Sequence, residues 1–108
     1  MVARVKVKCV IALLSPGQGA QTPGMLAPWL ELDGVAELLA ELSDAAGLDL
    51  RTLGTTADAE TIKDTKVAQP LIVATSLVSL HALEARVGSR SGWAQVSAGH
   101  SVGEFAAA

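Results

Sequence analysis

The chain has 108 residues, room for one domain, and half of them are hydrophobic. Eight basic and eleven acidic residues give a formal net charge of −3 without a basic block, which argues against a nucleic-acid-binding protein. A single cysteine, Cys9, excludes an intramolecular disulfide framework, and no cysteine–histidine cluster suggests zinc. We therefore expect neither a metal nor a nucleic acid as a ligand.

The first predicted element is a β-strand over residues 7–15, whose side chains are mostly apolar. Such a run is typical of a parallel strand that helices cover on both faces, and Cys9 within it would be a buried, inert thiol. The run is too short for a secretory signal or a membrane span, so we expect a cytoplasmic protein without a membrane partner. Prolines and glycines then predict a loop over 15–24, followed by a short helix over 25–32.

The middle of the chain is predicted to be helical. Asp33 is a candidate cap for a helix in which apolar residues recur at helical spacing, and Gly47 would end it. A single helical turn over 48–53 would end at Gly54.

The rest of the predicted elements lead to a second strand. Asp58 would cap a short helix that runs through Lys63, and Pro70, a residue favoured at the first helical position, would open a long helix to about Val87. A strand over 93–98 follows. Strands separated by helical segments indicate an α/β fold with a parallel sheet and helices on its faces.

The most informative motif is the pentad Gly99-His100-Ser101-Val102-Gly103, which fits the Gly-x-Ser-x-Gly pattern of a nucleophile elbow. In this tight turn a serine sits between a strand and a helix, and small residues flank it because a Cβ would collide with neighbouring backbone. A predicted strand precedes the pentad and a predicted helix follows it. The alternative is a glycine-rich turn with an incidental serine.

A second motif, Pro16-Gly17-Gln18-Gly19-Ala20-Gln21, follows the first predicted strand. Ligands gather at the carboxyl ends of parallel strands, and glycines let backbone N–H groups approach a developing oxyanion. If the two strands are neighbours, this loop faces Ser101. It is neither a phosphate-binding loop nor a dinucleotide-binding fingerprint, because no lysine follows and the third glycine is missing.

Together with the segment Val67-Ala68-Gln69-Pro70-Leu71, these two motifs resemble the acyl-carrier-protein malonyltransferase and polyketide acyltransferase family. The resemblance covers nearly the whole chain from about Val10. It implies a partial parallel sheet with helices on its faces, from the hydrolase-like large subdomain of an acyltransferase. Residues 1–108 would be the N-terminal part of one such domain, and its small ferredoxin-like subdomain would be absent.

The resemblance also implies roles for individual residues. Ser101 would be the nucleophile that takes a malonyl group from malonyl-CoA and passes it to the phosphopantetheine thiol of acyl carrier protein, in fatty acid or polyketide synthesis, without a bound cofactor. The backbone N–H groups of Gln18 and Val102 would form the oxyanion hole. The substrate pocket would be lined by Gln69, His100, Gly17 and Gly19.

The same resemblance places the general-base histidine and the arginine that pairs with the malonyl carboxylate beyond Ala108. We do not expect His81, within the long predicted helix, or His100, beside Ser101 on the turn, to replace that base. The 108-residue chain alone is therefore expected to have little or no turnover. Two alternatives stay open: a serine hydrolase of the α/β-hydrolase type, which uses the same elbow, and a non-catalytic remnant.

Overall fold

The computed structural model describes residues 10–108, so Cys9 and the first part of the predicted strand over 7–15 lie outside the described residues. The described part contains two parallel strands, β1 (Ala12–Ser15) and β2 (Val96–Gly99). Ala12 pairs with Val96 and Ser15 pairs with Gly99, so that both strands begin and end together and have their carboxyl ends at the same edge of the sheet. The segments that follow the two strands therefore start side by side.

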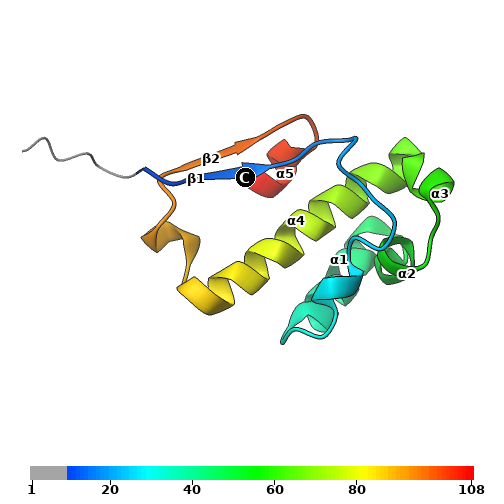
Figure 1. Cartoon of the computed structure of the whole chain (residues 1–108), viewed down its shortest axis with the longest axis horizontal. Coiled ribbons are helices and arrows are strands. Elements are labelled where there is room, and N and C mark those ends of the chain that lie inside the picture. Colours follow the sequence, from blue (N-terminus) through cyan, green and yellow to red (C-terminus); the bar gives the residue numbers. More distant parts are fainter. Residues whose placement is uncertain (1–9) are drawn as a thin grey trace, which may run out of the picture.

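Helices make up most of the described chain. They are the 3-10 turn η1 (Ala27–Trp29), α1 (Val35–Ala46), α2 (Leu50–Thr55), α3 (Ala59–Lys63), α4 (Thr65–Val87), the 3-10 turn η2 (Arg90–Gly92) and α5 (Gly103–Ala107). Figure 1 shows α4 running through the middle of the molecule, with the sheet and α5 on one side and α1 and α2 on the other. The described chain thus has the predicted mixed α/β architecture.

The main hydrophobic core lies among the helices rather than against the sheet. Its buried side chains come from the segment before η1 and from helices α1 to α4: Leu26, Val35, Leu39, Leu50, Ile62, Leu71, Ala74 and Val78. A smaller cluster, Ala68, Ile72 and Val102, joins α4 to the residue just before α5. Helix α4 therefore connects the core to the segment that follows β2.

Helix α4 is long and apolar enough to cross a membrane, judged by length and composition alone. It packs, however, against α1, α2, α3 and α5. These contacts are those of the central helix of a globular domain, so its apolar composition is weak evidence for a membrane span.

Two predicted helix starts are wrong. Helix α1 is preceded by Gly34, whose φ is 80°, and the Asp33 side chain does not cap it. Helix α4 begins at Thr65, five residues before Pro70, because the Asp64 carboxylate accepts a hydrogen bond from a first-turn backbone N–H at 3.0 Å. Pro70 therefore lies inside the helix, where its missing N–H leaves one intrahelical hydrogen bond unmade.

Of the other helix boundaries, some were predicted correctly and some were not. Gly47 ends α1 with a φ of 68°, and Asp58 caps α3, both as predicted. Gly54 lies inside α2 instead of ending it, since its carbonyl accepts the Leu26 N–H at 2.9 Å and the Leu26 side chain fills the space beside its Cα. The short helix predicted over 25–32 is reduced to the 3-10 turn η1.

The predicted burial of the first strand on both faces is wrong for its described part. Ser15 is buried, but Leu14 is 73% exposed, and Val96 at the start of β2 is 51% exposed. Within residues 10–108 the element that packs closely against both strands is α5, and a helix of five residues covers little of one sheet face. The strand predicted over 93–98 begins later, with β2.

Candidate active site

Strand β2 leads into a sharp turn that continues as α5. Ser101, in the middle of this turn, has a φ of 56°, the one positive φ of a non-glycine residue in the described part of the chain. The turn is closed by hydrogen bonds from the Gly103 N–H to the His100 carbonyl (2.9 Å) and from the Glu104 N–H to the Ser101 carbonyl (3.2 Å). A serine keeps this conformation only where its surroundings hold it, as in the strained strand-to-helix turn of a nucleophile elbow.

Both glycines of the pentad allow close packing of backbone on backbone. A Cβ on Gly99 would overlap the first turn of α5, and a Cβ on Gly103 would lie 2.6 Å from the Pro16 carbonyl oxygen and overlap that of Ser15. The His100 N–H in turn donates to the Ser15 carbonyl at 3.0 Å. The turn is thereby fixed to the ends of both strands.

The glycine-rich loop after β1 lies directly against this turn. Gly17 is buried, and a Cβ there would lie 2.8 Å from Nδ1 of His100 and 3.0 Å from Cβ of Ser101, and would overlap the His100 carbonyl. Gly19 has a φ of 107°, and its N–H donates to Oε1 of Gln21 at 2.8 Å, a hydrogen bond between two residues of the same loop. The loop therefore faces the serine, as the adjacency of the two strands requires.

Two glutamines predicted for the site lie in contact. Nε2 of Gln69 in α4 donates to Oε1 of Gln18 at 3.5 Å, and Nε2 of Gln18 donates to Oγ1 of Thr65 at 3.0 Å. Sequence reasoning missed Thr65, because a helix that begins at Pro70 does not place it on the same face as Gln69. The available signal was Asp64, a residue type favoured as a helix cap, since a helix that begins directly after it places Thr65 and Gln69 one turn apart on one face.

The backbone N–H groups of Val102 at the turn and of Gln18 in the loop find no acceptor among residues 10–108. Val102 packs its side chain against Ala68 and Ile72 of α4. Neither its N–H nor that of Gln18 donates a hydrogen bond to any of residues 10–108. One of these groups follows the serine directly and the other belongs to the loop that packs on it.

No hydrogen bond joins the Ser101 hydroxyl to a histidine within the described residues. Nε2 of His81 lies 3.1 Å from the Asp33 carbonyl oxygen, which ties α4 to the turn before α1. Nine residues of helix separate His81 from Ile72 beside the elbow, or about 13 Å along the axis. His100 is exposed on the turn itself. The described chain thus offers no paired general base.

Ionisable groups do not gather at the turn. Residues 10–108 contain no group of three or more His, Cys, Asp or Glu side chains that could hold a metal ion. The shifted carboxylates cap helices elsewhere: the hydroxyl and N–H of Thr52 hold the pKa of Asp49 below its ordinary 3.8, and those of Thr61 do the same to the pKa of Asp58.

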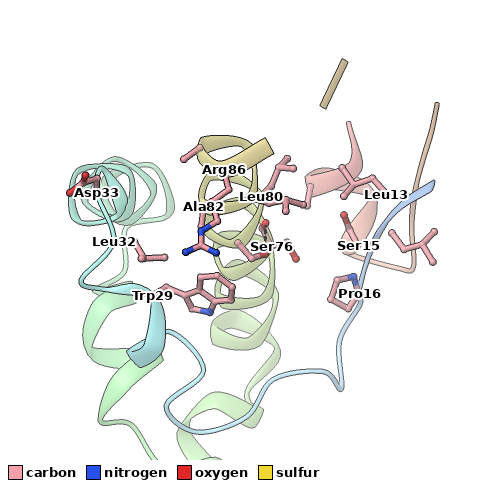
Figure 2. Close-up of a pocket in the computed structure, with 15 residues that line it drawn as sticks. Leu13, Ser15, Pro16, Trp29, Leu32, Asp33, Ser76, Leu80, Ala82 and Arg86 are labelled. Carbon is pink, nitrogen blue, oxygen red and sulfur yellow. Dashed lines mark hydrogen bonds between the residues drawn. The ribbon is translucent and has the colours of Figure 1, made fainter. Parts of the chain in front are cut away.

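A hollow of about 730 Å³ lies between β1 and α4. Figure 2 shows Arg86 and Trp29 on its helical side and Ser15 and Pro16 on the strand side. Most of the remaining lining side chains are apolar. Ser101 does not line it, so this hollow is next to the site but does not contain the turn.

A smaller hollow of about 430 Å³ does reach the site residues. It is lined by side chains of α1, α2, α4 and α5, including Gln69, and by Val102. Phe105 at its rim is 76% exposed and Lys66 supplies its charged group. The space nearest the elbow is thus apolar with a polar edge.

Comparison with known proteins finds relatives that match most of this chain. A scan against family models finds no match. Malonyl CoA-acyl carrier protein transacylases of Mycobacterium bovis and Mycobacterium tuberculosis, however, are each 58% identical to the chain over 98 residues, which is 91% of this chain and 32% of each relative. The chain is thus similar, over most of its own length, to about a third of a malonyl CoA-acyl carrier protein transacylase.

Solved structures show the same similarity. The crystal structure of MCAT from Mycobacterium tuberculosis has a TM-score of 0.85 and 57% identity, covering 92% of this chain and 32% of that one. A complex described as PlMCAT:AntF, a type II PKS acyl-carrier protein with its malonyl-transacylase, has a TM-score of 0.79 and 33% identity, covering 92% and 31%. The predicted acyltransferase fold is confirmed, and the chain spans about a third of the length of the relatives it matches.

Proposed function

We propose that Ser101 is the acyl-accepting nucleophile of a malonyl CoA-acyl carrier protein transacylase. The observation that carries this proposal is the packing of the loop after β1 on the elbow, with Gly17 so close to Ser101 and His100 that no side chain fits between them. The motifs named in the sequence thereby lie at one place. The whole protein would transfer malonyl groups from malonyl-CoA to acyl carrier protein in the cytoplasm, without a resident cofactor or metal.

The transfer consists of two displacements at one carbonyl carbon. The Ser101 oxygen attacks the thioester carbonyl of malonyl-CoA, loses its proton to a base, and forms an ester as the carbon–sulfur bond breaks and the CoA thiol leaves. The phosphopantetheine thiol of acyl carrier protein then attacks that ester. The serine oxygen leaves and regains a proton, and the carrier keeps the malonyl group as a thioester.

Each displacement passes through a tetrahedral state with a negative oxygen. The N–H groups of Gln18 and Val102, which find no acceptor within residues 10–108, are the donors we assign to that oxygen. Gln69 would line the pocket through its contact with Gln18. Gly17 and Gly19 would allow the close approach of the loop, and His100 would hold the turn to β1 through its N–H.

We propose that the base comes from a part of the transacylase outside residues 10–108, since no hydrogen bond joins either histidine of these residues to Ser101. A serine hydroxyl without a base is a weak nucleophile at neutral pH. We propose that the same outside part supplies the partner of the malonyl carboxylate.

The test uses a chimera in which residues 10–108 of this chain replace the matching third of the Mycobacterium tuberculosis transacylase. With radiolabelled malonyl-CoA and holo acyl carrier protein, the chimera should transfer label to the carrier. Ser101→Ala should lower kcat by about a million-fold, the usual scale for loss of a serine nucleophile. Ser91→Ala, which removes a hydroxyl that bonds only to Ser89, is the matched control.

Three outcomes separate the competing functions. Label on the carrier, with a malonyl ester on Ser101 seen by intact mass, supports the transacylase. Release of the label as free malonate in the presence of carrier supports a hydrolase. A folded chimera that forms no ester would contradict a catalytic role for this serine.

A further inference from the structure

Helix α4 touches both segments that we assign to the oxyanion hole. Ala68 and Ile72, one turn apart, pack against Val102. Thr65 and Gln69, also one turn apart and on a neighbouring face of the helix, bond to Gln18. The first turns of α4 therefore set the spacing between the two donor segments.

The loop side of this arrangement depends on few contacts. Gln18 is exposed, and its backbone N–H bonds to no residue in 10–108. The hydrogen bonds that hold it are those of its side-chain amide, at 3.0 Å to Thr65 and at 3.5 Å to Gln69. The shorter of the two ends on the threonine hydroxyl, so Thr65 is the stronger anchor.

Thr65 is suited to act as a fixed point. It is the first residue of α4, directly after Asp64, whose carboxylate accepts a backbone N–H at 3.0 Å and whose carbonyl accepts the Ala68 N–H at 2.7 Å. A β-branched side chain on such a capped turn has few rotamers available. A site group held from a helix is placed more accurately than one held by a loop alone.

We propose that Thr65 is a positioning residue for acyl transfer: its hydroxyl holds the Gln18 amide and so sets the distance of the Gln18 N–H from the Val102 N–H. The proposal rests on the proposed function for its effect on catalysis. The hydrogen bond itself is tested independently of any activity.

The bond is tested by NMR on the 108-residue chain labelled with ¹⁵N-glutamine, which gives four pairs of side-chain amide signals, from Gln18, Gln21, Gln69 and Gln95. Thr65→Val should move the Gln18 and Gln69 signals and leave those of Gln95 unchanged, because its Oε1 accepts the Ile11 N–H just before the two strands begin. Thr65→Ser should restore them. Unmoved Gln18 and Gln69 signals in Thr65→Val would overturn the proposal.

The effect on catalysis is tested in the chimera. Thr65→Val should lower kcat about tenfold at nearly unchanged KM for malonyl-CoA, short of the 10²–10³-fold loss seen when an oxyanion donor is removed. Thr65→Ser should recover most of the rate. Gln18→Ala, which keeps the N–H but loses the tether, should cost as much as Thr65→Val, and the double variant should cost no more than either.

The matched control is Thr75→Val on the same helix, whose hydroxyl bonds only to the Leu71 carbonyl; it should keep the full rate. Equal losses in Thr65→Val and Thr75→Val, or additive losses in the double variant, would overturn the positioning role. An inactive unsubstituted chimera would count against the proposed function, and the amide signals of the 108-residue chain would still decide whether Thr65 holds Gln18.

Discussion

Replacing Gly17 by alanine is the smallest change that tests how the loop and the elbow fit together. The added Cβ would lie 2.8 Å from Nδ1 of His100 and 3.0 Å from Cβ of Ser101, whereas ordinary contacts begin at 3.4 Å. Rotation of the His100 ring relieves only the first of these contacts. The Cβ also overlaps the His100 carbonyl, which is backbone and is fixed by the hydrogen bond that it accepts from Gly103. The loop itself must therefore recede by about 1 Å to bring this backbone contact out to 3.4 Å.

The size of the effect follows from that displacement. Overpacking of a close contact costs about 1–3 kcal/mol, and each kcal/mol lowers Tm by about 4–8 °C for a domain of this size. A misplacement of about 1 Å in a catalytic constellation can cost about a hundredfold in rate. We expect Gly17→Ala to lower the Tm of the 108-residue chain by about 5 °C or more, and to lower kcat of the chimera between tenfold and a hundredfold.

Circular dichroism melting and the malonyl-transfer assay measure these two quantities. Gly92→Ala is the matched control, because a Cβ there meets nothing within 4 Å and its φ is not in the left-handed region. It should leave both quantities unchanged. If Gly17→Ala behaves like Gly92→Ala, the loop does not pack on the elbow as described and the proposed site is wrong.

Three further predictions concern stability, pH and the isolated chain. Leu71→Ala should lower the free energy of unfolding in urea titrations by about 2–5 kcal/mol, because Leu71 is fully buried. Leu83→Ala on the same helix, at a residue 42% exposed, should lower it by about 0.5 kcal/mol, and equal losses would contradict the described core. Because the pKa of Asp58 is lowered in the folded chain, its cap stabilises α3 above pH 3.8, and this stabilisation is lost as the pH falls through the folded-state pKa. Thr61→Val should raise the pKa of Asp58 toward 3.8 in a ¹³C-carboxyl NMR titration, and an unchanged titration would refute the role of Thr61 in lowering it. The 108-residue chain mixed with malonyl-CoA should remain unmodified at Ser101, by intact mass, over a period in which the chimera is fully acylated; ready acylation of the isolated chain would show that an outside base is not needed.

The sequence predicted those parts of the site in which the backbone itself makes the contacts. The glycines at 17, 99 and 103 were recognised from their spacing, and each lies where a Cβ would collide with neighbouring atoms. The parallel pairing of the two strands followed from the helical segments between them. These features depend on local geometry and on chain order, both of which a single sequence carries.

Predictions that depended on the choice between competing local signals were less reliable. Pro70 favours a helix start, but the Asp64 carboxylate caps the chain earlier and packing tolerates the proline inside α4. Gly54 is a helix terminator by composition, yet Leu26 packs against it and keeps it within α2. For Pro70 one local signal outweighed another, whereas for Gly54 a contact with another segment outweighed the local propensity.

Thr65 was missed because the start of α4 was predicted at Pro70, five residues too late. That error shows how the helical core is related to the proposed site. Core packing against α1, α2 and α3 places α4 through side chains such as Leu71 and Val78, and α4 then presents Thr65 and Gln69 to the loop and Ala68 to Val102. The strands contribute little to that core, since Leu14 and Val96 are exposed. In the proposed site, the distance between the Gln18 and Val102 N–H groups is thus set by a helix that the core holds. A substitution that shifts α4 without unfolding it should therefore change kcat before it changes the Tm.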